Sequence, residues 1–151
     1  MTTPGPTTVV LSPDVLVSVA GHVDHDDPLE TGGVLLGHRA TATLHVTVAG
    51  GPGPWAVRRP NYFLRDLDHA RTLAAAAWET DGSQWIGEWH THPRGPARPS
   101  PLDLRTYRRL LTDPELGFDA FLSLVVTPAG LTAWAVARHS RAGPVRLDVR
   151  T

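Results

Sequence analysis

The sequence contains no cysteine and no lysine, and its longest apolar stretch is far too short to span a bilayer. Without cysteine the chain forms no disulfide, and any zinc site must be built from histidines and carboxylates. All 14 basic residues are therefore arginines. Together with the frequent Ala, Gly and Pro, this bias points to the codon usage of a GC-rich genome rather than to chemistry.

The chain also lacks any block of like charges, and its formal net charge is −1 at pH 7. This balance gives no argument for nucleic acid or a membrane surface as a partner. The first six residues lack the charged and then apolar pattern of a signal peptide. We therefore expect a cytoplasmic protein, and the sequence leaves its oligomeric state open.

The length of 151 residues predicts a single domain over residues 1–151, with residues 1–7 as a flexible N-terminus. Helical spacing of apolar residues after Ser12, Asp66 and Ser100 predicts three capped helices. Alternating or continuous apolar stretches predict strands over residues 8–11, 33–37, 42–49, 84–91, 121–126, 131–138 and 145–149. The pattern indicates an α/β fold, in which Trp85 and Trp89 share the strand face opposite His90 and belong to the core.

The segment Glu88-Trp-His-Thr-His-Pro93 places two histidines two residues apart in a predicted strand. Side chains alternate along a strand, so His90 and His92 point to the same side with Cα atoms roughly 6.6 Å apart. Two imidazoles at that separation can bind one metal ion. A polar face on an edge strand explains the pair equally well.

Ser100-Pro-Leu-Asp103 has the pattern of a helix capping box, and capping alone is a sufficient explanation. A carboxylate at this position can also be a third metal ligand, because two histidines, one carboxylate and an open position form a catalytic zinc pattern. The candidate base is Glu30, which leads directly into the glycine-rich apolar segment Thr31–Gly37. Local sequence alone favours a solvated surface glutamate at this junction of loop and strand.

Taken together, Glu30, His90-Thr-His92, seven further residues and Ser100-x-x-Asp103 resemble the complete JAMM motif of the JAB/MPN+ metallopeptidases. The surrounding Glu-Thr-Gly-Gly-Val-Leu-Leu-Gly and Gly-Glu-Trp-His-Thr-His-Pro segments resemble the prokaryotic branch. The other common zinc peptidase signature, His-Glu-x-x-His, is absent. The resemblance implies a JAB/MPN-type domain with a central mixed curved β-sheet flanked by helices, in a cytidine-deaminase-like architecture.

The resemblance also implies roles for the motif residues. His90, His92 and Asp103 would bind one catalytic Zn²⁺ ion. Glu30 would take the proton of the attacking water and pass it to the leaving amine. Ser100 would donate a hydrogen bond to the oxyanion. By its position Glu88 shares the histidine face, and it is interpreted as a supporting residue at most.

Members of this family cut peptide or isopeptide bonds after the C-terminal tail of ubiquitin or a ubiquitin-like protein. The prokaryotic branch occurs with bacterial conjugation systems, including antiphage CBASS operons. The resemblance therefore implies a ubiquitin-like protein or its conjugate as substrate. Edge-strand pairing is one way in which an extended tail could be held beside the metal. The resemblance does not choose between maturation and deconjugation, and a binding partner that completes the groove remains an open possibility.

Two alternatives remain at this point. One is a peptidase that processes a sulfur-carrier protein, for which neighbouring genes of cysteine or cofactor synthesis would argue. The other is an inert MPN scaffold that only binds partners, which would take up no stoichiometric metal.

Overall fold

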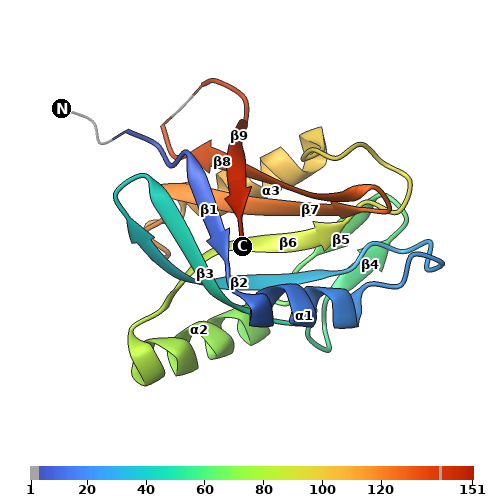
Figure 1. Ribbon diagram of the computed structural model, residues 1–151, viewed down its shortest axis with the longest axis horizontal. Helices are drawn as coiled ribbons and strands as arrows, with labels where there is room; N and C mark the ends of the chain where they lie inside the picture. Colours follow the sequence, from blue (N-terminus) through green and yellow to red (C-terminus); the bar gives the residue numbers. More distant parts are fainter. Residues whose placement is uncertain (1–3, 140) are drawn as a thin grey trace.

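The computed structural model describes residues 4–139 and 141–151. Its helices and strands follow the order β1 (Thr8–Leu11), α1 (Pro13–His22), β2 (Gly32–Ala40), β3 (Thr43–Ala49), β4 (Val57–Arg59), β5 (Tyr62–Leu64), α2 (Leu67–Asp81), β6 (Gln84–Thr91), α3 (Pro101–Thr112), β7 (Ala120–Thr127), β8 (Gly130–Ala137) and β9 (Val145–Arg150) (Figure 1). In this part of the chain no helix has the length and apolar character that crossing a membrane requires. Residues 1–3 of the predicted flexible N-terminus lie outside the described residues.

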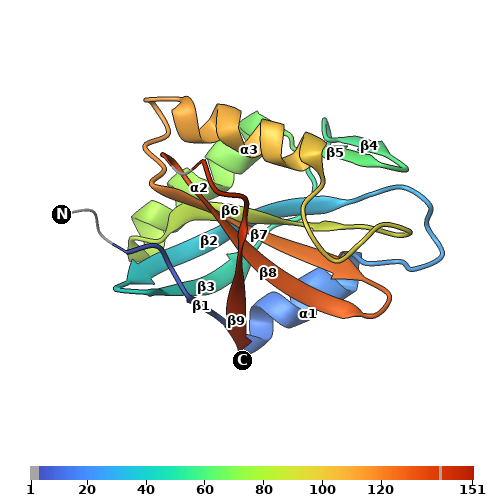
Figure 2. The same ribbon diagram turned by 90° about the horizontal axis from the view of Figure 1, so that it is seen from above.

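Seven strands form a closed barrel in the order β1-β3-β2-β6-β7-β8-β9, and β1 closes it by pairing in parallel with both β3 and β9. Helices α2 and α3 lie on one side of the barrel and α1 lies on the other (Figure 2). The predicted mixed sheet flanked by helices is confirmed, but its closure was not predicted. The cytidine-deaminase-like detail and the single domain over residues 1–151 stay predictions.

Closure of the barrel also bears on how an extended substrate tail could bind. Each barrel strand pairs with a neighbour on both sides, so the main sheet offers no long free edge for the predicted strand pairing. Strands β4 and β5 form a separate two-stranded hairpin. This hairpin lies at the end of the barrel towards which β6 points (Figures 1 and 2).

The three predicted helix starts are confirmed, each with its capping side chain. Ser12 accepts a hydrogen bond from the backbone N–H of Val15, and Asp66 accepts one from that of His69. Ser100 forms a complete capping box with Asp103. These caps satisfy donors that a helix start leaves free, and they define where each helix begins.

The interior of the barrel holds the main apolar core. Trp89 is fully buried there and packs with strand residues such as Leu35 and Leu124, while α1 contributes Val15 and Val19. Two smaller clusters lie outside the barrel, one beneath α3 and one beneath α2. Side chains of β6 therefore point either into the barrel core or outward, towards the clusters beneath α2 and α3.

The prediction that Trp85 and Trp89 share a strand face is wrong. A register shift opposite Leu35 and Leu36 inserts Ile86 as an extra residue in β6. Trp85 therefore turns outward, where its ring meets Phe118 edge-on at 5.1 Å, whereas Trp89 points into the barrel. The sequence shows no turn or proline at this position, so strict alternation was the natural prediction.

Strand β2 passes so close to a neighbouring loop that a side chain has no room at Gly33. A Cβ atom built there would lie 1.9 Å from the backbone oxygen of Gly50, and backbone cannot move aside as a flexible side chain can. Glycine is therefore required at this position because the backbones of β2 and the loop approach each other so closely.

We predict that Gly33→Ala lowers the free energy of unfolding by about 2–3 kcal/mol, because of this overlap. The control is Gly21→Ala in α1, where a new Cβ meets nothing within 4 Å. Alanine is the better helix former, so this variant should raise the free energy of unfolding by about 0.5–1 kcal/mol. Urea unfolding measures both, and equal effects of the two changes would contradict the steric argument.

Candidate metal centre

Four buried side chains converge at the end of the barrel where β6 finishes. Glu30 precedes β2, His90 lies in β6, His92 follows β6, and Asp103 lies in the first turn of α3. Each offers one oxygen or nitrogen atom, and these atoms all lie within 4.8 Å of one another. They are the one such cluster found in residues 4–139 and 141–151. The structure therefore brings together the three predicted ligands and the predicted base.

The backbone places these groups through a direct link between β2 and β6. Thr91, between the two histidines, donates its backbone N–H to the carbonyl of Thr31 at 2.8 Å. Its side-chain oxygen accepts the backbone N–H of Thr31 at 2.9 Å. Thr31 directly follows Glu30, so the two hydrogen bonds fix the predicted base beside the histidine pair.

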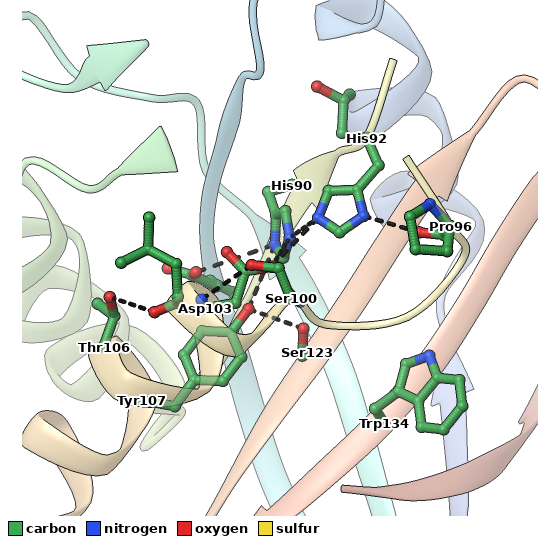
Figure 3. Close-up of polar contacts among 12 residues, drawn as sticks. His90, His92, Pro96, Ser100, Asp103, Thr106, Tyr107, Ser123 and Trp134 are labelled. Carbon is green, nitrogen blue, oxygen red and sulfur yellow. Dashed lines mark hydrogen bonds and ion pairs between the residues drawn. The ribbon is translucent and has the colours of Figure 1, made fainter. Parts of the chain in front are cut away.

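The two imidazoles and the carboxylate face each other across a small space (Figure 3). His90 Nε2 and His92 Nε2 are 2.9 Å apart, and Asp103 Oδ2 lies 3.2 and 3.1 Å from them. Tetrahedral ligands at about 2.0–2.1 Å from zinc would be separated by about 3.3 Å. The triangle is a few tenths of an ångström smaller, so its atoms and donor types fit a zinc ion after a slight expansion.

Each histidine is held by its other ring nitrogen. His92 Nδ1–H donates to the carbonyl of Pro96 at 2.8 Å, which leaves Nε2 to face the cluster. His90 Nδ1 lies 3.3 Å from the hydroxyl of Tyr107, which in turn lies 2.8 Å from Ser123 Oγ. Figure 3 shows Pro96 on the side of the His92 ring that points away from Asp103. Ligating histidines in metalloproteins are commonly held in this way.

Ser100 and Asp103 combine helix capping with a place in the cluster. Asp103 Oδ2, the oxygen nearest the histidines, also accepts the backbone N–H of Ser100 at 2.8 Å. Ser100 Oγ accepts the backbone N–H of Asp103 at 3.0 Å, so its own hydrogen is not used in the cap. The capping interpretation and the functional interpretation of this motif are therefore compatible.

Charge and burial shift the ionisation of the cluster. Burial alone would raise the pKa of Asp103, but hydrogen bonds from His90 and His92 hold it well below its usual range. Burial disfavours the charged form of His92, but hydrogen bonds to Asp103 and to the carbonyl of Pro96 favour it, and the net effect is a raised pKa. A proton therefore binds where a cation would bind, and a metal ion would have to displace it.

Among the described residues, Glu30 Oε1 is the one side-chain nitrogen or oxygen atom that is fully shielded from solvent and has no hydrogen-bond partner. Burial raises the pKa of Glu30 from 4.5 to about 7, against the opposing effect of the nearby histidines. Its backbone, in contrast, is bonded on both sides to the β4–β5 hairpin. The N–H donates to the carbonyl of Arg59 at 2.9 Å, and the carbonyl accepts from Arg58 Nε at 3.0 Å. An oxygen without a partner beside three candidate ligand atoms indicates a position for a bound ion or water.

A buried ion pair lies behind His90. Arg65 donates Nε–H and Nη2–H to the same oxygen of Glu88, with the Nε contact at 2.8 Å. The other carboxylate oxygen lies 3.9 Å from His90 Nδ1. Glu88 therefore supports the site from behind, as its position in the strand indicated, and Arg65 balances its charge.

Sequence reasoning missed Tyr107, Ser123, Arg65 and the carbonyl of Pro96. Tyr107 comes one helical turn after Asp103 and so lies on the same face of α3, which is a signal that could have identified it. Ser123 pairs with Glu88 across adjacent parallel strands. No local sequence pattern predicts that pairing, because it depends on how β6 and β7 align.

Comparison with known proteins identifies the family of this chain and supports its fold. Residues 12–140 match the family described as prokaryotic homologs of the JAB domain, and the chain belongs to this family. A CD-NTase/cGAS isopeptidase from Vibrio cholerae is 32% identical over 114 residues, which cover 68% of this chain and 72% of the relative. A protein of the same name from Pseudomonas aeruginosa is 33% identical over 56% of this chain and 55% of its own length.

Further similarities extend the comparison beyond these isopeptidases. A probable metalloprotease from Sinorhizobium fredii is 33% identical over 60% of this chain, and the match covers 57% of its own length. The solution structure of a protein from Desulfitobacterium hafniense superimposes with a TM-score of 0.70. That match covers 94% of this chain and 91% of the other at 20% identity, and it shows the shared fold.

We predict that Arg65→Met lowers the free energy of unfolding by about 3–5 kcal/mol, because Glu88 would be left as an unpaired buried charge. The double variant Arg65→Met/Glu88→Gln should recover much of this loss. The control is Arg71→Met, whose contact with Glu115 is exposed and 3.9 Å long. This control should lower the free energy of unfolding by less than about 1 kcal/mol. Urea unfolding of the metal-free protein tests this, and equal losses in the two single variants would contradict it.

A second prediction concerns the metal-free protein and pH. Because the folded-state pKa of Glu30 is about 7, above its ordinary 4.5, the folded state binds this proton more tightly than the unfolded state. Unfolding free energy should therefore fall as pH rises between these values. Glutamine does not ionise, so Glu30→Gln lacks this loss. Its unfolding free energy, relative to that of the wild type, should therefore rise by about 1–3 kcal/mol from pH 4.5 to 8.

Chelator-treated protein unfolded in urea at both pH values provides the measurement. Glu79→Gln, at an exposed position of α2, is the control and should change stability by less than about 0.5 kcal/mol. A difference between Glu30→Gln and the wild type that stays constant with pH would refute the assignment.

Proposed function

We propose that the protein is a zinc-dependent isopeptidase or peptidase that cleaves after the C-terminal tail of a ubiquitin-like protein. The observation that carries this proposal is the buried triangle of His90 Nε2, His92 Nε2 and Asp103 Oδ2 with the unpartnered Glu30 oxygen beside it. Two imidazoles and a carboxylate are a zinc donor set, and three protein ligands leave room for substrate. When bound there, zinc would act as a Lewis acid that polarises the scissile carbonyl and makes water more acidic.

Glu30 is the proposed general base and acid. Its pKa of about 7 suits a group that accepts a proton near neutral pH and returns it within the same reaction. In the proposed mechanism Glu30 takes a proton from the attacking water and delivers it to the leaving nitrogen. The hairpin bonds of its backbone keep the carboxylate from moving away between these two transfers.

Ser100 is the proposed donor to the developing oxyanion. Its oxygen accepts the backbone N–H of Asp103, which fixes the side chain, while its hydrogen remains available for the substrate. A donor held in place before the reaction needs no reorganisation in the transition state. The capping box thus supports the proposal that this serine is both a helix cap and a positioned hydrogen-bond donor.

The substrate class follows from the relatives. Several of them are named CD-NTase/cGAS isopeptidases, and the family resemblance points to ubiquitin-like tails. We therefore propose a conjugate of a CD-NTase as the substrate, in a bacterial antiphage system. The β4–β5 hairpin provides a free strand edge near Glu30, and we propose that the extended tail lies beside it.

The test is incubation of the zinc-loaded protein with a CD-NTase conjugate from the same genome, with mass spectrometry of the products. Glu30→Gln should keep stoichiometric zinc while hydrolysis falls by at least about 100-fold. His92→Ala should lose both zinc and hydrolysis. Glu79→Gln is the matched control and should keep both.

Different failures would contradict different parts of the proposal. A folded wild-type protein that takes up no zinc would refute the metallopeptidase and favour a scaffold. Full hydrolysis by Glu30→Gln would remove this residue from the mechanism. Cleavage of a sulfur-carrier precursor, with the CD-NTase conjugate left intact, would refute the substrate assignment.

A further inference from the structure

A row of completely buried polar side chains continues from His90 away from the metal centre. Tyr107, from the second turn of α3, and Ser123, from the middle of β7, each have 0% exposure, as does His90 itself. The Tyr107 hydroxyl lies 3.3 Å from His90 Nδ1 and 2.8 Å from Ser123 Oγ (Figure 3). Neither residue belongs to the motif that identifies the site.

The Tyr107 hydroxyl has a single hydrogen, and its direction decides which nitrogen of His90 is free. If the hydrogen goes to Ser123, the phenolic oxygen accepts Nδ1–H of His90, and Nε2 keeps its lone pair towards Asp103. If the hydrogen goes to His90 Nδ1, neutral His90 carries its own hydrogen on Nε2 and cannot bind a cation there. Metal binding at Nε2 therefore requires the first arrangement.

Other groups around His90 cannot take over this role. The nearest Glu88 oxygen is 3.9 Å from Nδ1, too far for a hydrogen bond, and the other oxygen is occupied by Arg65. A phenol hydroxyl carries one hydrogen to donate and lone pairs that accept, and the Tyr107 hydroxyl lies between His90 Nδ1 and Ser123 Oγ. It can thus accept from His90 and donate to Ser123 at the same time.

We propose that Tyr107 is a positioning residue that fixes the tautomer of His90 by accepting its Nδ1–H and donating its own hydrogen to Ser123. This inference rests on the proposed metal site, and it adds two residues on which zinc affinity depends. The Tyr107 ring also stacks on Phe121 with centroids 4.7 Å apart. Tyr107→Phe therefore removes the hydroxyl while the packing of the ring is kept.

The experiment measures zinc affinity of the full chain by competition with a chelator. Tyr107→Phe is expected to bind zinc about 10–100-fold more weakly than the wild type. Thr112→Val removes a hydroxyl at the exposed C-terminal end of α3, where it donates to helix carbonyls, and should leave the affinity unchanged. Thermal unfolding of the metal-free variants shows whether each is folded.

A spectroscopic readout separates tautomer control from general damage to the fold. Nitrogen-15 NMR of the zinc-loaded wild type should show His90 with hydrogen on Nδ1 and zinc on Nε2. In Tyr107→Phe the Nδ1–H signal should lose its protection from exchange with solvent. Ser123→Ala, which removes the acceptor of the Tyr107 hydrogen, should weaken zinc binding in the same direction, and it decides the matter if Tyr107→Phe does not fold.

A folded Tyr107→Phe variant with wild-type zinc affinity would overturn the inference and leave the proposed function intact. Zinc bound through Nδ1 of His90 would overturn it as well. If the wild type itself bound no zinc, the proposed function would fail, and this inference would fail with it.

Discussion

The structure depends on a concentration of electron-pair donors in a place that water cannot easily reach. Two imidazole nitrogens and a carboxylate oxygen lie 2.9–3.2 Å apart, and a fourth buried oxygen has no partner. Lone pairs at such separations repel unless a positive charge lies among them. In the protein without metal that charge is a proton, as the raised pKa of His92 indicates. The whole end of the barrel is therefore organised around a cation.

The surrounding fold is best understood as the means of holding these donors together. The Thr31–Thr91 bonds join the segments that carry the proposed base and the histidines, and the capping box fixes the proposed third ligand at a helix start. Behind the donors, the balanced Arg65–Glu88 pair and the tyrosine hydroxyl support His90. The local energetic cost of converging polar groups is thus offset by hydrogen bonds in the layer behind them.

The sequence predicts the parts of this arrangement that short-range rules govern. Each helix start follows from a capping residue, and the side on which His90 and His92 point follows from strand alternation. What it cannot predict depends on alignment between distant segments: the closure of the barrel by β1 and β9, the hairpin that holds Glu30, and the meeting of Tyr107 with Ser123. The prediction that Trp85 and Trp89 share a strand face is wrong for the same reason, because partner strands determine where a bulge forms.

That bulge has a consequence for how such a site can change over evolutionary time. Ile86 and Gly87 together occupy the space of one residue opposite β2, so the two halves of β6 alternate out of phase. Deletion of Ile86 would remove the bulge and leave Leu36 opposite Trp85 and Leu35 opposite Gly87, so the tryptophan beneath α3 and the histidine pair would keep their present sides. The first half of β6 should therefore tolerate the loss of one residue far better than β7, where a single-residue deletion would shift the regular pairing with β6 and β8 by one and turn part of the strand to the other face.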